Sequence, residues 1–111
     1  KRNTPQIRWT RIENTSLLGT PDLLGYNTSG RFFTVELKVT KSNKIKFSPH
    51  QIAFHITHPK NSYILVKSLD QSDLKLFPGT KIQQLVACGF RLEACSLGLK
   101  SVIETLETCG L

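Results

Sequence analysis

The sequence lacks any apolar run long enough to cross a bilayer as a helix, so we expect no membrane partner. It also lacks a signal-peptide pattern after Lys1, an internal repeat, a low-complexity tract and a linker. At 111 residues the chain is long enough to bury a core of its own. Together these features predict one globular domain spanning residues 1–111.

Cysteine is scarce, and its spacing fits no metal site. The three cysteines, Cys88, Cys95 and Cys109, are an odd number without the spacing of a zinc finger. We therefore expect reduced thiols in an intracellular protein, cytoplasmic or associated with the nucleoid or nucleus, rather than disulfides in a secreted one.

Acidic residues are also in short supply. Eight Asp and Glu face fifteen Lys and Arg, which gives a formal net charge of +7. A small domain with this excess often binds a polyanion such as nucleic acid, although the same excess would also serve solubility alone. From Arg31 to Lys60 the chain contains six basic residues, three histidines and one acid, Glu36. A lone carboxylate among so many cations needs a specific explanation.

The N-terminal half has the composition of β-strands. The segments QIRWTRIE, residues 6–13, and RFFTVELKVT, residues 31–40, are rich in β-branched and aromatic residues. Between them the short apolar run PDLLGY, residues 21–26, precedes the turn cluster NTSG. These segments predict an antiparallel meander, after which the chain leaves the sheet.

The rest of the chain predicts helices around one further strand. Ser48 suits a helix N-cap, Pro49 suits the first helical position, and Pro59 would end the helix. The residues of this helix expected to face a sheet are Ile52, Ala53 and Ile56. SYILVKSL, residues 62–69, predicts a buried strand. Two amphipathic helices follow from apolar residues at helical spacing: Ile82, Leu85 and Val86 before Gly89, and Leu99, Val102, Ile103 and Leu106 before Gly110. The order β-β-β-α-β-α-α predicts an α/β domain with a mixed central sheet flanked by helices.

The predicted hairpin carries three charged residues in an apolar setting. Because side chains alternate along a strand, Glu36 and Lys38 lie on one face, while Val35 and Leu37 point to the other, toward a core. Thirteen residues separate Asp22 from Glu36, enough for two short strands and a turn, so the two carboxylates can converge. Converging carboxylates repel unless a cation lies between them, and Mg²⁺ commonly binds one or two carboxylates with water and phosphate. Taken alone, each motif also fits an ordinary turn or a surface ion pair.

These residues resemble the motif of the PD-(D/E)XK nuclease superfamily, in which Pro-Asp is followed after a variable gap by Glu or Asp, any residue, and Lys. Here the motif reads Pro21-Asp22 and Glu36-Leu37-Lys38. The flanking segments RIENTSLLGTPDLLGY, TVELKVT and FSPHQ are similar to the VRR-NUC and Holliday-junction-resolvase-like branch, and the resemblance covers residues 8 to about 67. The resemblance implies a restriction-endonuclease-like fold.

The resemblance also implies an activity and a set of site residues. The activity is that of a Mg²⁺- or Mn²⁺-dependent endodeoxyribonuclease that hydrolyses phosphodiester bonds. Asp22 and Glu36 would bind the metal with the backbone carbonyl of Leu37, and Lys38 would be the catalytic lysine. Gln51, in the helix after the catalytic strand, would lie at the edge of the site.

The branch suggests a homodimer acting in repair or recombination, on branched DNA such as a Holliday junction or on flap DNA. The alternative function is a non-catalytic nucleic-acid-binding module with a decayed nuclease site. One feature departs from the family pattern, because members frequently complete the metal site with an acidic residue on an N-terminal helix. Only about a turn of chain precedes the first predicted strand, and Glu13, the sole acid before Asp22, is a weak substitute because it lies in that strand.

Several residues keep two interpretations. Ser48 and Gln51 have the spacing of a capping box, which would explain both without catalysis. The residues that either contact phosphate or form a solvated loop after the catalytic strand are Lys41, Lys44 and Lys46.

The histidines and aromatic residues complete the predictions. His50, His55 and His58 lack the spacing of a zinc site. His55 and His58 fall with Gln51 on one polar stripe, and we expect both histidines to contact nucleic acid. Trp9, and Phe32 or Phe33, are expected in the core rather than stacked on bases.

Overall fold

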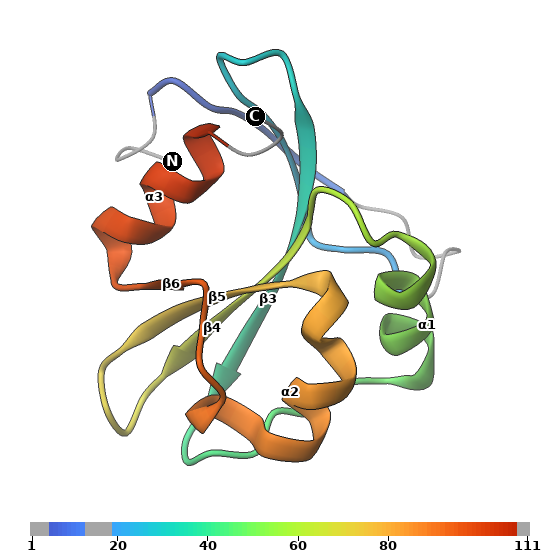
Figure 1. Ribbon diagram of the computed structural model, residues 1–111, viewed down its shortest axis with the longest axis vertical. Helices are drawn as coiled ribbons and strands as arrows, with labels where there is room; N and C mark the ends of the chain where they lie inside the picture. The colour runs from blue at the N-terminus through green and yellow to red at the C-terminus, as the bar shows by residue number, and fades with distance from the viewer. Residues whose placement is uncertain (1–4, 13–18, 109–111) are drawn as a thin grey trace.

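The computed structural model describes residues 5–12 and 19–108, which form a six-stranded sheet with helices packed on it (Figure 1). The strands are β1 (Arg8–Arg11), β2 (Leu23–Tyr26), β3 (Phe32–Thr40), β4 (Ser62–Ser68), β5 (Leu74–Pro78) and β6 (Ser96–Leu97). The helices are α1 (Pro49–Thr57), α2 (Ile82–Cys88) and α3 (Leu99–Thr108), with 3-10 turns η1 (Gly79–Lys81) and η2 (Gly89–Arg91). The structure confirms the predicted α/β architecture, a mixed sheet flanked by helices.

The strands lie side by side in the order of the sequence. β3 and β4 run parallel, and the other neighbouring strands run antiparallel. The parallel pair needs a crossover connection, which α1 supplies. Strands β1 to β3 form the predicted meander, and Asn27 organises its turn by accepting the Ser29 and Arg31 N–H groups, both at 3.1 Å. The Asn27 amide also donates to the Leu106 carbonyl at 3.0 Å, which ties the turn to α3.

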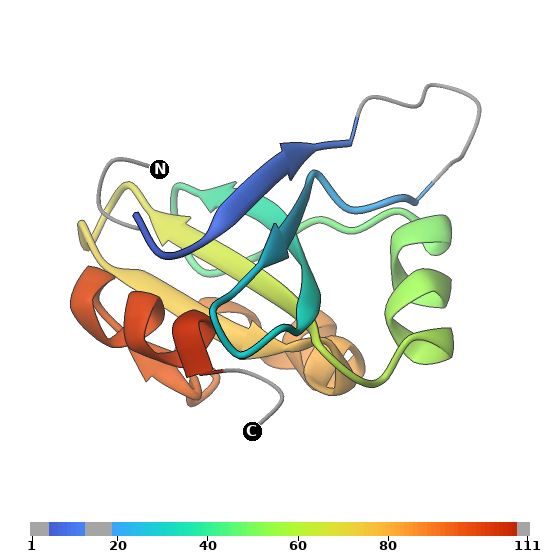
Figure 2. The same cartoon turned by 90° about the horizontal axis from the view of Figure 1, so that it is seen from above.

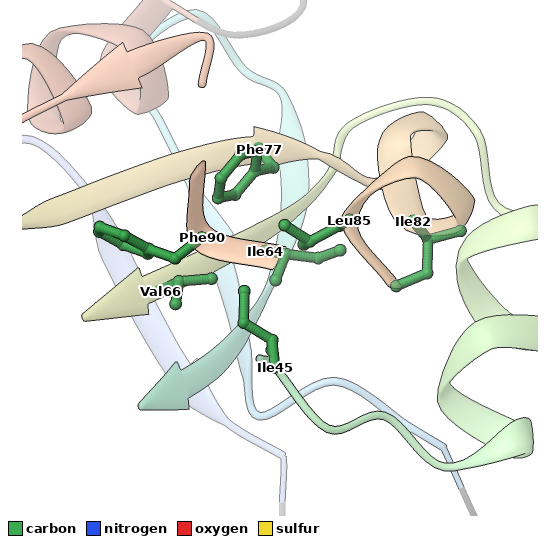
Figure 3. Packing of buried hydrophobic residues seen from close by; sticks show 7 residues of the cluster. All are labelled: Ile45, Ile64, Val66, Phe77, Ile82, Leu85 and Phe90. Atoms are coloured by element: carbon green, nitrogen blue, oxygen red, sulfur yellow. The ribbon is translucent and has the colours of Figure 1, made fainter. Parts of the chain in front are cut away.

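The sheet buries one apolar cluster on each face. One cluster joins the sheet to α3 and contains Ile7, Phe33, Val35, Leu76, Val102 and Leu106. The other lies under α2 and contains Ile45, Ile64, Val66, Phe77, Ile82, Leu85 and Phe90, which point toward one another in Figure 3. Figures 1 and 2 show α1 and α3 on opposite sides of β3, so each face of this strand has a helical neighbour.

Strands β5 and β6 were not predicted. The β5 strand ends in Pro78, and a proline, which lacks an N–H group, is tolerated at a strand end. Within β5, Leu76 and Phe77 are fully buried on opposite faces, so the strand is covered on both sides and shows no apolar–polar alternation. At the other edge, β1 is shorter than the predicted 6–13, and Glu13 lies outside the described residues.

The helices expose some residues that were expected to pack on the sheet. In α1, Ile52 packs against the core as predicted, but Ala53 and Ile56 are exposed and His55 is fully buried in their place. Val86 and Leu99 are also exposed, because α2 and α3 each cover a narrower part of the sheet than their apolar patterns suggest. Gly110 and Cys109 lie outside the described residues, whereas Cys88 and Cys95 are free thiols. No helix in the described ranges has the length and apolar character needed to span a bilayer.

Candidate functional site

The hairpin of β2 and β3 brings Asp22 next to Glu36. The register pairs Leu23 with Val35, so Asp22 and Glu36 form the next opposed position. The carboxylate Oδ2 of Asp22 accepts the N–H of Leu37 at 2.8 Å, and the Asp22 carbonyl accepts the N–H of Ile12 at 2.9 Å. Asp22 is thus held between β1 and β3, and the convergence inferred from the sequence is present.

The turn before Asp22 packs against the start of α1. Gly19 has a positive φ of 80°, a conformation that favours glycine. A Cβ at Gly19 would lie 2.4 Å from the backbone oxygen of His50, so no side chain fits there without moving one of the two segments. Pro21 is buried beside it. The glycine therefore allows the close approach that places Pro21 and Asp22 beside the first turn of α1.

Glu36 is a buried carboxyl group with incomplete hydrogen bonding. Its side chain is 3% exposed, and Oε2 accepts a hydrogen bond from Gln51 Nε2 at 3.3 Å. Oε1 is buried and has no hydrogen-bond donor in the described part of the chain. A buried oxygen without a donor is costly, so such an atom fits a position where a ligand or cation completes the site.

Burial and Asp22 together disfavour the charged form of Glu36. The pKa of Glu36 is raised to about 8, first because burial penalises the carboxylate. Asp22 adds to this effect, because it hydrogen-bonds with the protonated form and repels the charged form. Lys38 offsets part of the rise by its positive charge. Without a cation, the site therefore holds Glu36 as a carboxylic acid near neutral pH.

Gln51 connects the helix cap to the site. Its Oε1 accepts the Lys38 ammonium at 2.9 Å and the Ser48 N–H at 3.0 Å. Its own N–H donates to Ser48 Oγ at 3.1 Å, which completes the capping box at the start of α1. Its Nε2 reaches Glu36, as described above. The sequence left capping and involvement in the active site as alternatives; in the structure Gln51 forms the capping box and also contacts Lys38 and Glu36.

Lys38 is held at the site by two different contacts. Besides its hydrogen bond to Gln51, its ammonium lies 4.9 Å from the centre of the Phe47 ring, within the range of a cation–π interaction. Lys38 and Glu36 share a face of β3, as the alternation of side chains predicts. On the opposite face Val35 is buried, but Leu37 is 46% exposed, so the expectation that both point into a core holds for Val35 alone.

The donor set suits a hard divalent cation. Two carboxylates on adjacent strands, one with an orphaned buried oxygen, match the one or two carboxylates that Mg²⁺ commonly takes. Among residues 5–12 and 19–108, no group of three or more His, Cys, Asp or Glu side chains is placed to hold a metal. Further ligands would therefore be backbone oxygens such as the Leu37 carbonyl, water, or substrate phosphate.

The three histidines have different environments. His50 and His58 are exposed, and His58 stacks on Phe54 with ring centroids 4.0 Å apart. His55 is fully buried, so it does not lie on the surface stripe that the sequence suggested for nucleic-acid contact. The helix turns His55 toward β4, where its Nδ1 lies 3.0 Å from Ser62 Oγ. Burial lowers the pKa of His55 to about 4, with smaller contributions from the charges of His58 and Lys38.

The basic loop and two aromatic residues complete the surroundings. Lys41, Lys44 and Lys46 are all exposed after β3, a position compatible with either of their predicted roles. Phe33 is buried and Trp9 packs edge-on against it at 5.4 Å, as expected of core residues. Phe32, by contrast, is 59% exposed. Alternation along β3 puts Phe32 on the same face as Glu36, so the spacing in the sequence already distinguishes Phe32 from the buried Phe33.

No protein-family model, no curated protein and no solved structure matches the chain.

Proposed function

We propose that this protein is a Mg²⁺- or Mn²⁺-dependent DNA endonuclease of the PD-(D/E)XK kind, with a restriction-endonuclease-like fold. The observation that carries the proposal is the pairing of Asp22 with Glu36, whose buried Oε1 has no donor among the described residues. Asp22 accepts the Leu37 N–H and Glu36 Oε2 accepts from Gln51, but within the described residues neither contact brings a cation between the two carboxylates. The homodimer suggested by the sequence stays a prediction.

In the reaction, a water oxygen attacks phosphorus and the bond from phosphorus to the leaving oxygen breaks. A divalent cation bound by Asp22, Glu36 and the Leu37 carbonyl would lower the pKa of the attacking water and polarise the scissile phosphate. Lys38 would position the water or stabilise the charge that develops on the phosphate. Gln51 keeps the Lys38 ammonium on the carboxylate side of the strand, because one amide contacts both Lys38 and Glu36.

The rival function is a non-catalytic nucleic-acid-binding module. It is favoured by the small donor set, since no third acidic, His or Cys side chain joins the pair within the described ranges. The basic charge of +7 suits either function. The difference between the two lies in turnover, so the test must separate cleavage from binding.

The test is cleavage of plasmid, flap and four-way-junction DNA with Mg²⁺, with Mn²⁺ or with EDTA. We expect the parent protein to cleave at least one substrate only when metal is present. Glu36→Gln should still bind DNA but should lose cleavage by about a hundredfold or more. Glu104→Gln, an exposed neutralisation on α3, is the matched control and should cleave like the parent. Equal cleavage by Glu36→Gln would refute the nuclease site, and binding without any cleavage would favour the rival.

A further inference from the structure

A row of exposed side chains continues the face that carries Glu36. Phe32 lies four residues before Glu36 on β3, and therefore on the same face at a distance of about 13 Å. Tyr26 pairs with Phe32 across β2 and β3, and Arg8 pairs with Tyr26 across β1 and β2. Arg8, Tyr26 and Phe32 thus form a row across three strands. We call these three residues the aromatic row.

The aromatic row is open to solvent and hollowed. Phe32 is 59% exposed and Tyr26 is 38% exposed, with their ring centroids 4.5 Å apart. They line a hollow of about 400 Å³ together with Arg8, Thr10 and Leu24. On the side toward α1, Phe32 also lines a second hollow of about 210 Å³ with Phe54, His58 and Lys60. Phe32 and Leu24 line both hollows, so the two hollows are neighbours, and together we call them the track; it extends from the edge of the sheet toward α1.

The track combines π-faces with positive charge. Arg8 contributes a cation at one end and Lys60 contributes one at the other. Among the described residues that line the two hollows, none is acidic. In the hollow that contains Lys60, the ring of His58 stacks on Phe54. Flat rings next to cations are the surface chemistry that binds a single nucleic-acid strand, because bases stack on the rings and phosphates meet the cations.

We propose that the aromatic row binds unpaired nucleotides of a DNA strand that leads to the Asp22–Glu36 site, a proposal that rests on the nuclease function above. The faces of bases inside a duplex are covered by their neighbours, so only unpaired bases can stack on Phe32 and Tyr26. The separation of about 13 Å from Glu36 corresponds to about four stacked nucleotides at 3.4 Å each. The preferred substrate therefore has a single-stranded segment on that side of the cleaved bond, as a flap or a splayed arm does.

The experiment compares single-stranded and duplex DNA of the same sequence by fluorescence anisotropy in EDTA, so that neither metal nor cleavage is needed. Phe32→Ala should weaken binding of the single strand by about fivefold or more while duplex binding stays within about twofold. Phe32→Leu should behave like Phe32→Ala because it lacks a π-face, and Phe32→Tyr should restore binding. Arg8→Gln should lower the salt slope for the single strand by about 0.7.

The matched control is Val39→Ala, which truncates an equally exposed apolar residue on the same strand. Val39 is 63% exposed but points to the opposite face of β3, so neither DNA should bind differently. Three results would overturn the inference. Phe32→Ala could weaken binding of both DNAs equally, it could weaken binding of neither, or the parent could fail to bind single strands. A change of oligomeric mass in Phe32→Ala without a change in DNA binding would assign the row to a second copy instead, and would also overturn it.

The outcome is separable from that of the nuclease proposal. If the protein cleaves DNA but Phe32→Ala does not change DNA binding, the nuclease proposal is supported and the proposed role of the aromatic row is refuted. Single-strand binding that depends on Phe32, in a protein that cleaves no DNA, would support the row and refute the nuclease.

Discussion

Binding of a divalent cation at the Asp22–Glu36 site should depend strongly on pH between pH 6 and pH 8. The perturbation is protonation of Glu36, whose pKa of about 8 reflects burial and the neighbouring Asp22. A cation binds the deprotonated carboxylate, so the proton competes with it whenever the pH lies below that pKa. The expected effect follows from the fraction of Glu36 that is ionised at each pH.

With a pKa of about 8, the apparent dissociation constant of Mn²⁺ should be about fiftyfold larger at pH 6 than at pH 8, with about a ninefold change between pH 6 and pH 7 and about a fivefold change between pH 7 and pH 8. The assay is titration of the protein with Mn²⁺ at three pH values, in which electron paramagnetic resonance reports the free ion. Glu36→Gln should lose the binding at each pH. His50→Gln should keep the pH dependence, because it replaces an exposed imidazole at the neighbouring helix terminus and leaves both carboxylates in place. An affinity that does not change between pH 6 and pH 8 would refute the reasoning, since it would mean that no carboxyl group of raised pKa binds the ion.

Two further predictions test the lysine and the buried histidine. Lys38→Arg should keep DNA affinity within a few-fold but lower the rate of single-turnover cleavage by about a hundredfold or more. The reason is that the planar guanidinium cannot replace an ammonium that contacts both Gln51 and Phe47. A rate close to that of the parent would show that Lys38 takes no part in the mechanism. His55 has a pKa lowered to about 4 from 6.5, so its unfolded state binds the proton more tightly, and the stability it confers is present above pH 6.5 and lost as the pH falls toward 4. Between pH 7 and pH 4, the free energy of unfolding measured by urea denaturation should fall by about 3 kcal/mol more in the parent than in His55→Gln. Equal falls in the two proteins would show that His55 is not held neutral in the folded state.

The elements with strong local signals were predictable from the sequence. The Ser48-Pro49 start of α1 depends on capping, which is a property of a few adjacent residues, and it was found where expected. Alternation of side chains placed Glu36 and Lys38 on one face, and the length of the intervening segment allowed Asp22 to approach them. These inferences use spacing along the chain, so they needed no knowledge of distant segments.

Predictions failed where a residue's environment comes from distant parts of the chain. β5 shows no alternation because helices cover both of its faces, and only the finished sheet supplies those partners. His55 was expected on the surface, but it lies on the side of α1 that faces β4, where it contacts Ser62. The contacts of Gln51 with Lys38 and Glu36 hold α1 in this orientation. Leu37 was expected to point toward a core but is 46% exposed; of Phe32 and Phe33, the pair from which one core residue was expected, Phe33 is buried and Phe32 is exposed.

The sequence by itself determined strands β1 to β4, the three helices, the pair of carboxylates and the lysine beside them, since each depends on periodicity or on short spacing. The tertiary structure decided the protonation of Glu36 and the hydrogen bonds that Glu36 and Lys38 form. Burial and the approach of Asp22 raise the pKa of Glu36, and a cap residue contributed by a separate helix binds both Glu36 and Lys38. It also decided that Arg8, Tyr26 and Phe32 form one exposed row, because strand register brings together residues from three separate segments of the chain.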